Sequence, residues 1–299
     1  MKTAPECFAC FMQQAVRVAK MVGCDDLTQM ALTKDVAALL VQLDDEASPP
    51  ANAIGIYEAI RARTGCVDPY LKIKRLENQR ALGHLPLLRT ELAGQARPLP
   101  MAIRFAIAAN RIDYGIANPL DADAVLRRCR TEPFAVDHRQ HLLAAVRQLQ
   151  PGGSILYLAD NCGEIVYDAL VVEILARQGL AVTVAVRESP IINDALREDA
   201  EVAGLGQWAS IVSNGTACPG TPLARCTEEF RALFDSADLV ISKGQGNFES
   251  LAEVQREMFF LLTVKCPIVA DYLNRRLTGE ERLRGEGEMV VYHSAAPAG

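Results

Sequence analysis

The residues best suited to chemistry stand directly after short apolar runs in the second half of the chain. Asp160 and Asn161 follow the run 155–159, and a helical pattern restarts at Glu164. Open α/β sheets bind ligands beyond the carboxyl ends of their strands. A carboxylate beside an amide oxygen suits a hard divalent cation such as Mg²⁺ or Mn²⁺. The helix N-terminus that follows favours a phosphate group, because its N–H groups carry partial positive charge.

Similar residues recur after later apolar runs. Asp194 follows the run 181–186, Asn214 follows 210–213, and a lysine- and glycine-rich turn follows 239–242. The residues of interest in that turn are Lys243, Gly244, Gly246, Asn247 and Glu249. Each group alone is also typical of a helix cap or a tight turn, and the turn lacks the glycine patterns of nucleotide sites. Capping does not require a lysine, so we expect the groups to converge on one site. The candidates for binding the substrate or its phosphate are Glu164, Asn214, Gly244, Gly246, Asn247 and Glu249.

The chemistry that this set favours is hydrolysis of a phosphate ester. A divalent ion (Mg²⁺, Mn²⁺, Co²⁺ or Ni²⁺) held by Asp160, Asn161 and Asp194 would polarise phosphoryl oxygens and activate water. Lys243 would neutralise a phosphate oxygen, and the backbone around 163 and 244–247 would bind others. Asp160 itself is an alternative nucleophile. Haloacid-dehalogenase phosphatases use an Asp-x-Asp pair there, whereas residue 162 is Cys, which favours water.

The elements that must position these residues change character near residue 150. Residues 1–150 show helical periodicity without a strand signal, and residues 151–299 alternate apolar strands with helices. We therefore predict an α/β fold: an N-terminal all-helical domain, 1–150, and a Rossmann-like α/β/α sandwich with a mainly parallel sheet, 151–299. The predicted strands are 155–159, 181–186, 210–213, 239–242, 259–264 and 289–292.

Composition excludes several classes of protein. The 299 residues carry a net charge of −6 without a Lys/Arg cluster, which argues against a nucleic-acid partner. No apolar run is long enough to span a membrane, and the N-terminus is not typical of a signal peptide. The nine cysteines are scattered and odd in number, so a disulfide framework is not expected. We expect a cytoplasmic protein, and the sequence does not fix its oligomeric state.

At this point the motifs resemble those of a known family, the metal-dependent damage-control phosphatases of the stand-alone prokaryotic type. The matching pieces occur in order along nearly the whole chain: C-F-A-C at 7–10, D-P-Y at 68–70, A-N-R-I-D-Y-G at 109–115, L-A-D-N-C-G-E-I-V-Y-D at 158–168, S-P-I-I-N-D-A at 189–195, S-N-G-T-A-C-P-G-T at 213–221 and I-S-K-G-Q-G-N-F-E-S-L at 241–251. The resemblance implies metal ligands at Asp160, Asn161 and Asp194, and a phosphate contact from Lys243. It implies small phosphorylated metabolites as substrates, such as sugar phosphates or damaged cofactor precursors.

Several residues have a weaker claim to function. Asn110 and Asp113 lie where a helix ends, and the resemblance implies that they reach across to the pocket. Cys7 and Cys10 form a C-x-x-C at helical spacing, which is more typical of packing than of zinc binding or redox chemistry. A zinc site would need two further ligands, for which His138 and His141 are candidates. Arg187 is a candidate phosphate contact or an exposed structural residue.

Two other functions compete with the phosphatase prediction. A methyltransferase that uses S-adenosylmethionine would share the Rossmann-like sheet, but it normally has a glycine-rich turn after the first strand. Asp160 and Asn161 occupy that place, and the carboxylate would repel the carboxylate of the methyl donor. The second alternative is a non-enzymatic protein that binds a metabolite. A lysine beside two carboxylates argues against it, because this combination favours turnover of a substrate.

Overall fold

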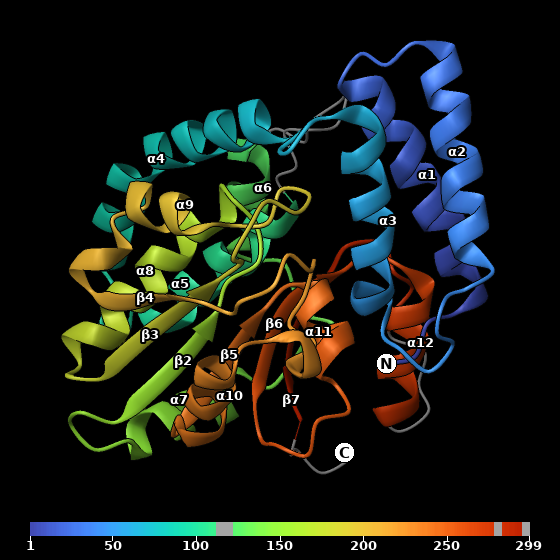
Figure 1. The fold of residues 1–299 in the computed structure, drawn as a ribbon. Coiled ribbons are helices and arrows are strands. Elements are labelled where there is room, and N and C mark those ends of the chain that lie inside the picture. Colours follow the sequence, from blue (N-terminus) through green and yellow to red (C-terminus); the bar gives the residue numbers. More distant parts are fainter. Residues whose placement is uncertain (112–121, 278–282, 295–299) are drawn as a thin grey trace.

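A mainly parallel sheet with helices on both faces forms the centre of the computed structural model, which describes residues 1–111, 122–277 and 283–294 (Figure 1). The described strands lie in the order β1-β7-β6-β5-β2-β3-β4, and only the β6/β7 pair is antiparallel. This arrangement confirms the predicted α/β class. The strands are β1 (Val136–Asp137), β2 (Ser154–Leu158), β3 (Ala181–Val186), β4 (Ala209–Ser213), β5 (Leu239–Lys243), β6 (Phe259–Val264) and β7 (Glu288–His293).

The chain reverses its direction of travel across the sheet at β2. The strands β3 and β4 extend the sheet on one side of β2, whereas β5 and β6 extend it on the other. Such a switch point leaves a crevice beyond the carboxyl ends of the two central strands, because the loops that follow them diverge. The loops that begin at Ala159 after β2 and at Gly244 after β5 therefore flank the expected ligand position.

Alternating side chains along each strand fill two separate hydrophobic cores. Ile155 and Tyr157 of β2 face the core under α4–α8, whereas Leu156 and Leu158 face the core under α10–α12. Strands buried on both faces read as continuous apolar runs, which is why these segments are visible in the sequence. The helices are α4 (Leu71–Ala93), α5 (Leu99–Ala108), α6 (Ala122–Cys129), α7 (Arg139–Gln148), α8 (Glu164–Arg177), α9 (Arg197–Val202), α10 (Glu228–Ser236), α11 (Gln245–Leu251) and α12 (Pro267–Arg276).

The first three helices form a bundle beside the sheet (Figure 1). They are α1 (Pro5–Met21), α2 (Asp26–Leu40) and α3 (Pro49–Thr64). Their local sequence explains their ends, because Asp25 caps α2 by accepting from the Thr28 amide and Ser48 with Pro49 begins α3. The bundle has its own core, and α3 packs against α11 of the sheet domain. This contact brings the N-terminal helices close to the loop after β5.

The hydrophobic cores do not divide where the sequence pattern changes. The helices α4, α5, α6 and α7 lie before residue 150, yet their apolar side chains share a core with the sheet. The first half also holds a strand that the sequence pattern did not indicate, since β1 pairs with β7 through Val136 and Val290. A strand of two residues is too short to show an alternating pattern in the sequence. The prediction that residues 1–150 contain no strand was therefore wrong. The domain boundary near residue 150 stays a prediction.

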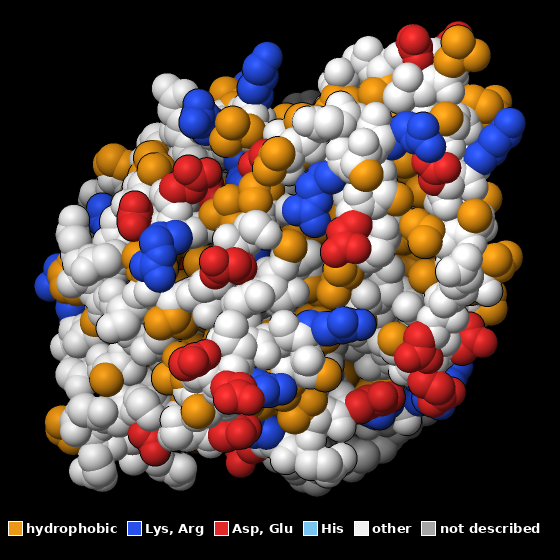
Figure 2. Space-filling view, viewed as in Figure 1, with side chains coloured by type: hydrophobic (Ala, Val, Ile, Leu, Met, Phe, Trp, Pro, Cys, Tyr) orange, Lys and Arg blue, Asp and Glu red, His pale blue; other side chains and the backbone are white. Residues whose placement is uncertain are grey.

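Three features of the described residues bear on the excluded classes. None of their helices combines the length and the apolar character needed to cross a bilayer. All nine cysteines are free thiols. On the face shown in Figure 2, acidic and basic side chains are interspersed over the surface.

Candidate metal and phosphate site

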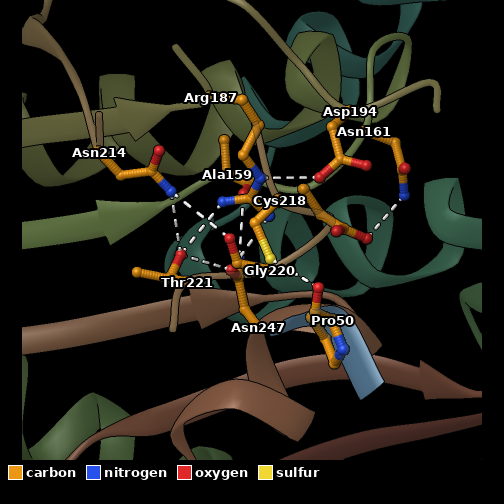
Figure 3. A network of polar contacts seen from close by, with 12 residues as sticks. Pro50, Ala159, Asn161, Arg187, Asp194, Asn214, Cys218, Gly220, Thr221 and Asn247 are labelled. Atoms are coloured by element: carbon orange, nitrogen blue, oxygen red, sulfur yellow. Dashed lines mark hydrogen bonds and ion pairs between the residues drawn. The ribbon is translucent and has the colours of Figure 1, made fainter. Parts of the chain in front are cut away.

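The loops after β2 and β3 are joined by backbone hydrogen bonds, which bring the three predicted metal ligands together. Asn161 and Asp194 form an isolated antiparallel bridge, and the Ala195 amide donates to the Asp160 carbonyl oxygen at 2.8 Å. The Cys162 amide donates to the Asn193 carbonyl oxygen at 2.8 Å. In Figure 3, Asp194 and Asn161 lie side by side beyond the ends of the strands. Residues far apart in the sequence therefore meet, as the strand-end argument predicts.

The turn after β5 packs its backbone directly against Asp160. Gly244 has a φ of 78°, and a Cβ atom there would overlap the Asp160 carboxylate. Only glycine satisfies both the positive φ and the close approach. The short helix α11 that follows begins at Gln245 and is held to the site by this contact. Gly244 thus fixes the relative position of the β2 and β5 loops.

The site contains more buried negative charge than its own cations neutralise. Four carboxyl groups are buried there, and two buried cations face them: Asp160, Glu164, Asp168 and Asp194 against Arg187 and Lys243. Burial and repulsion from Glu164 and Asp194 raise the pKa of Asp160 well above its usual value, although Arg187 and Lys265 act in the opposite direction. Burial raises the pKa of Asp194 to about 6 despite its ion pair with Arg187. The excess of two negative charges fits a divalent cation.

The donor set available to such a cation consists of two carboxylates and one amide. Asp194 accepts from Arg187 Nε at 2.7 Å through one oxygen, and its other oxygen points toward Asn161 (Figure 3). Asn161 donates through Nδ2 to Asp160 at 2.6 Å and to Glu164 at 3.1 Å, which leaves its amide oxygen for another partner. Within the described residues no three Cys, His, Asp or Glu side chains gather as a metal-binding group, so the predicted ligand set depends on the Asn161 amide oxygen as its third donor. Hard oxygen donors of this kind fit Mg²⁺ or Mn²⁺.

Lys243 lies beneath the site rather than at its surface. Its ammonium group contacts Glu164 Oε1 at 2.6 Å, Asp168 Oδ1 at 2.5 Å and the Ala106 carbonyl oxygen at 3.1 Å. The side chain is fully buried, and the two carboxylates raise the pKa of Lys243 against the effect of burial. With three partners the ammonium is saturated, so it orients Glu164 toward Asp160. Its direct contact with a phosphate stays a prediction.

Asn110 reaches the site from the end of α5, in the 3₁₀ turn Ala109–Arg111. Its Nδ2 donates to Asp160 at 3.0 Å and to Glu164 at 2.6 Å, and its Oδ1 accepts from Thr263 at 2.6 Å. The helical half of the chain therefore contributes a residue that holds both carboxylates in place. Asp113, the other candidate of this motif, lies outside the described residues.

Other predicted phosphate-binding residues hold loops together instead of facing the metal ligands. Asn247 donates to the Ala159 carbonyl oxygen at 3.0 Å, and its Oδ1 accepts from Thr221 at 2.7 Å and from Arg187 at 3.0 Å (Figure 3). Asn214 accepts from the Thr216 amide at 3.1 Å, and Gly246 packs against the Pro219 carbonyl. Arg187 is buried in this network, so the expectation of an exposed structural role was wrong. Phosphate binding by Asn214, Gly246 and Asn247 stays a prediction.

One basic residue at the mouth of the site was missed by the sequence argument. Lys265 directly follows β6 and lines a cavity of about 60 Å³ together with Asn110, Asn161, Cys162, Glu164 and Asn193. Its side chain is exposed, and none of the described acidic residues forms an ion pair with it. Residues that follow parallel strands lie at the same edge of the sheet. Because β6 is parallel to β5, the argument that placed Lys243 at this edge also applies to Lys265. Cys162 itself turns away from the ligands and donates its thiol to Glu77 at 2.9 Å.

Glu249 lies away from the metal ligands, on the wall of a second cavity. Burial raises its pKa to about 7, although the hydrogen bond from Gln245 at 2.8 Å lowers it. A folded-state pKa above the ordinary value of 4.5 favours folding at low pH, and this contribution is lost as pH rises toward 7. We therefore expect Glu249→Gln to raise the free energy of unfolding by about 1–2 kcal/mol at pH 8 and to leave it unchanged at pH 4.5.

Urea unfolding at the two pH values measures this difference. The exposed Glu58 on α3 supplies the control Glu58→Gln, which should not stabilise the protein because this side chain is not buried. A gain of the same size for Glu249→Gln at both pH values would contradict the assignment, because an uncharged packing effect does not titrate.

Comparisons with known proteins identify the same family as the sequence motifs. The model of the damage-control phosphatase ARMT1-like domain matches residues 3–279. A damage-control phosphatase of Pyrococcus horikoshii is 32% identical over 274 residues, covering 90% of this chain and 93% of that protein. One of Archaeoglobus fulgidus is 30% identical over 276 residues, covering 90% and 94%. The crystal structure of a DUF89-family protein from Pyrococcus horikoshii superimposes with a TM-score of 0.85 at 29% identity, over 97% of this chain and 98% of that one. The chain therefore belongs to the damage-control phosphatase family with the ARMT1-like domain.

Proposed function

We propose that this protein is a metal-dependent phosphomonoester hydrolase that acts on a small phosphorylated metabolite, such as a sugar phosphate or a damaged cofactor precursor. The observation that carries the proposal is the uncompensated acidic cluster at the switch point, with the exposed Lys265 at its mouth. An acidic cluster alone would repel a phosphate dianion. A divalent cation on Asp160, Asn161 and Asp194 would neutralise the excess negative charge, and the positive charge of Lys265 beside it would then attract the phosphate dianion.

The chemistry divides between the ion and the side chains of the chain. When bound, the ion supplies Lewis-acid polarisation of the phosphoryl oxygens and lowers the pKa of water. Asn110 and Lys243 hold Glu164 and Asp160 in fixed orientations, and the raised pKa of Asp160 reflects its burial. Water adds to phosphorus, the bond from phosphorus to the leaving oxygen breaks, and the leaving oxygen takes up a proton. The products are an alcohol and inorganic phosphate.

Water is the nucleophile that we favour over Asp160. One Asp160 oxygen already accepts from two amide groups, Asn110 Nδ2 at 3.0 Å and Asn161 Nδ2 at 2.6 Å. Gly244 crowds the same carboxylate. A carboxylate restrained in this way is suited to holding a cation, and it has little freedom to swing toward phosphorus.

The test is phosphate release from a panel of phosphomonoesters by protein dialysed against a chelator. We expect no release until Mg²⁺, Mn²⁺, Co²⁺ or Ni²⁺ is restored. No release with any of these ions would contradict the proposal, and calorimetry with S-adenosylmethionine would then test the methyltransferase alternative. Binding of a sugar phosphate without turnover would favour a metabolite-binding protein.

We expect Lys265→Gln to raise KM for phosphate esters by about tenfold, with a smaller change in kcat, because Lys265 attracts the dianion electrostatically. The increase should shrink at high salt, since the side chain is exposed and its charge is screened. Steady-state kinetics at low and high ionic strength provide the measurement.

The exposed Lys72 on α4 lines none of the cavities of this site, so Lys72→Gln is the matched control and should leave KM unchanged. An unaltered KM in Lys265→Gln, together with unaltered inhibition by inorganic phosphate, would show that Lys265 does not bind the phosphoryl group.

A further inference from the structure

A second cavity lies between the N-terminal bundle and the sheet domain, next to the proposed phosphoryl site. Its volume is about 260 Å³, and α1, α3, α11 and the start of α12 form its walls. Most of the lining is apolar, including Phe11, Pro49, Pro50 and Ile268. The cysteines of the C-x-x-C motif lie on its rim together with Cys266, whereas α7, which follows His138, lies on the far side of the molecule (Figure 1). The proposed pairing of these cysteines with His138 and His141 as zinc ligands therefore finds no support.

Two buried polar atoms of residues that line this cavity have no hydrogen-bond partner in the described part of the chain. They are Tyr57 Oη and Gln14 Oε1. The Tyr57 side chain is only 8% exposed, and burial raises the pKa of its hydroxyl, with Asp194 and Cys10 adding to the effect. Buried polar groups are almost always paired, because an unpaired one reduces stability. One hydroxyl donor and one carbonyl acceptor beside the same cavity therefore indicate a ligand that supplies both partners.

The cavity and the phosphoryl site share three loops. Gly244 touches Asp160, and the next residue, Gln245, lines the cavity. Lys265 lines the small cavity at the metal ligands, and Cys266 lines the large one. Ile192 lines the large cavity two residues before Asp194. The loops that hold the proposed phosphoryl site therefore also form part of the wall of this apolar cavity.

The other large hollow beside Lys265 is less suited to the organic part of a substrate. It measures about 410 Å³ and is lined by Arg111 and Arg128, together with Glu286. Both guanidinium groups are already paired with Glu132, at 2.6 Å and 3.2 Å. These two guanidinium groups thus already share a carboxylate partner, whereas the two unpaired buried atoms belong to residues that line the apolar cavity.

We propose that the apolar cavity binds the non-phosphoryl part of the substrate, a small and mainly apolar chain that carries a hydroxyl or amide group. The hydroxyl of Tyr57 donates to that group and the Gln14 carbonyl accepts from it. This inference rests on the proposed phosphatase function. After the bond between phosphorus and the leaving oxygen breaks, the leaving oxygen takes up a proton and the alcohol departs from the cavity, while inorganic phosphate remains beside Lys265.

A series of synthetic phosphate esters tests the proposal. With Mn²⁺ present, kcat/KM is expected to rise by at least about tenfold from ethyl phosphate to 6-hydroxyhexyl phosphate, because the longer chain reaches the apolar cavity. Tyr57→Phe is expected to lower kcat/KM for 6-hydroxyhexyl phosphate by about threefold to tenfold, and to leave ethyl phosphate unaffected. Its melting temperature should stay the same or rise, since the removed oxygen has no partner.

A filling variant gives a second line of evidence. Ala53 on α3 lines the cavity, so Ala53→Leu is expected to remove the preference for the longer ester. Ala59→Leu on the same helix adds the same volume away from the cavity and should keep the preference. If Ala53→Leu fails to fold, Tyr57→Phe still decides the question.

Alkylation of the rim cysteines separates this inference from the phosphatase proposal, because it needs no turnover. In chelator-treated protein, 1,6-hexanediol, which is the alcohol part of 6-hydroxyhexyl phosphate, should slow the reaction of Cys7 and Cys10 with N-ethylmaleimide, and inorganic phosphate should not. Cys24 and Cys66 do not line the cavity and serve as internal controls. Protection without hydrolysis of any ester would overturn the phosphatase proposal and support the cavity. Hydrolysis with no chain-length preference and no protection would overturn the cavity alone.

Discussion

Asp160→Asn is expected to lower kcat for phosphate release by at least about 10²–10³-fold and, in chelator-treated protein, to increase the free energy of unfolding by about 1–2 kcal/mol. Activity falls because the carboxylate is a proposed ligand of the catalytic ion. Stability rises because the ionised side chain is buried and is repelled by Glu164 and Asp194. An amide of the same shape keeps the acceptor oxygen for Asn110 and Asn161, and it removes the charge.

Saturating Mn²⁺ should reverse the order of stability. An ion that binds only the folded state stabilises it by about 2.7 kcal/mol at a hundred times its Kd, and Asp160→Asn should lose this gain. Chemical denaturation in the presence of chelator and in the presence of Mn²⁺ measures the free energy of unfolding of each protein without and with the ion. Asp238 lies at the opposite end of the sheet, where it accepts from the Ser154 amide at 2.7 Å, so Asp238→Asn should retain activity and its response to Mn²⁺. If Asp160→Asn keeps most of its activity, the site has been assigned to the wrong residues.

The elements that could be predicted are those whose burial produces a recognisable pattern of apolar residues in the sequence. The runs that became β2, β3 and β5 are buried on both faces, so they are continuous and apolar. Because parallel strands share an edge, their trailing residues were expected to meet, and Asp160, Asn161 and Asp194 do meet. The order of the strands was not predictable, because pairing between distant segments depends on the whole core. The two-residue β1 leaves no period at all.

The environment of each site residue was harder to predict than its position. Lys243 was expected to face a phosphate, but it is buried between Glu164 and Asp168. One signal was present in the sequence, because these two acids are four residues apart in the otherwise apolar first half of a helix. Acids on a buried helix face need a cation, and Lys243 is the one that the fold supplies. Lys265 follows β6 as Lys243 ends β5, so position at a strand end does not by itself distinguish the exposed lysine from the buried one.

Lys243→Met is expected to reduce the free energy of unfolding by about 3–5 kcal/mol at pH 8, because it leaves Glu164 and Asp168 as buried carboxylates without a cation. The loss should become smaller as pH falls toward 5. Burial already raises the pKa of Asp168 to about 6 with Lys243 present, and removal of the ammonium group raises it further. Protonation on the acidic side of that value therefore neutralises Asp168 in the folded variant, and this stabilising contribution is lost as pH rises.

Urea unfolding of the single variant and of Lys243→Met combined with Glu164→Gln and Asp168→Asn tests the explanation. The combined variant should recover most of the lost stability, since it no longer buries unpaired charges, and it should lose the pH dependence. Lys2 and Glu46 form an ion pair at 2.5 Å with side chains 60% and 72% exposed, so Lys2→Met is the control and should leave the free energy of unfolding almost unchanged. The explanation would be wrong if Lys243→Met had normal stability and lost only its affinity for phosphate. That result would show that Lys243 contacts the phosphate directly.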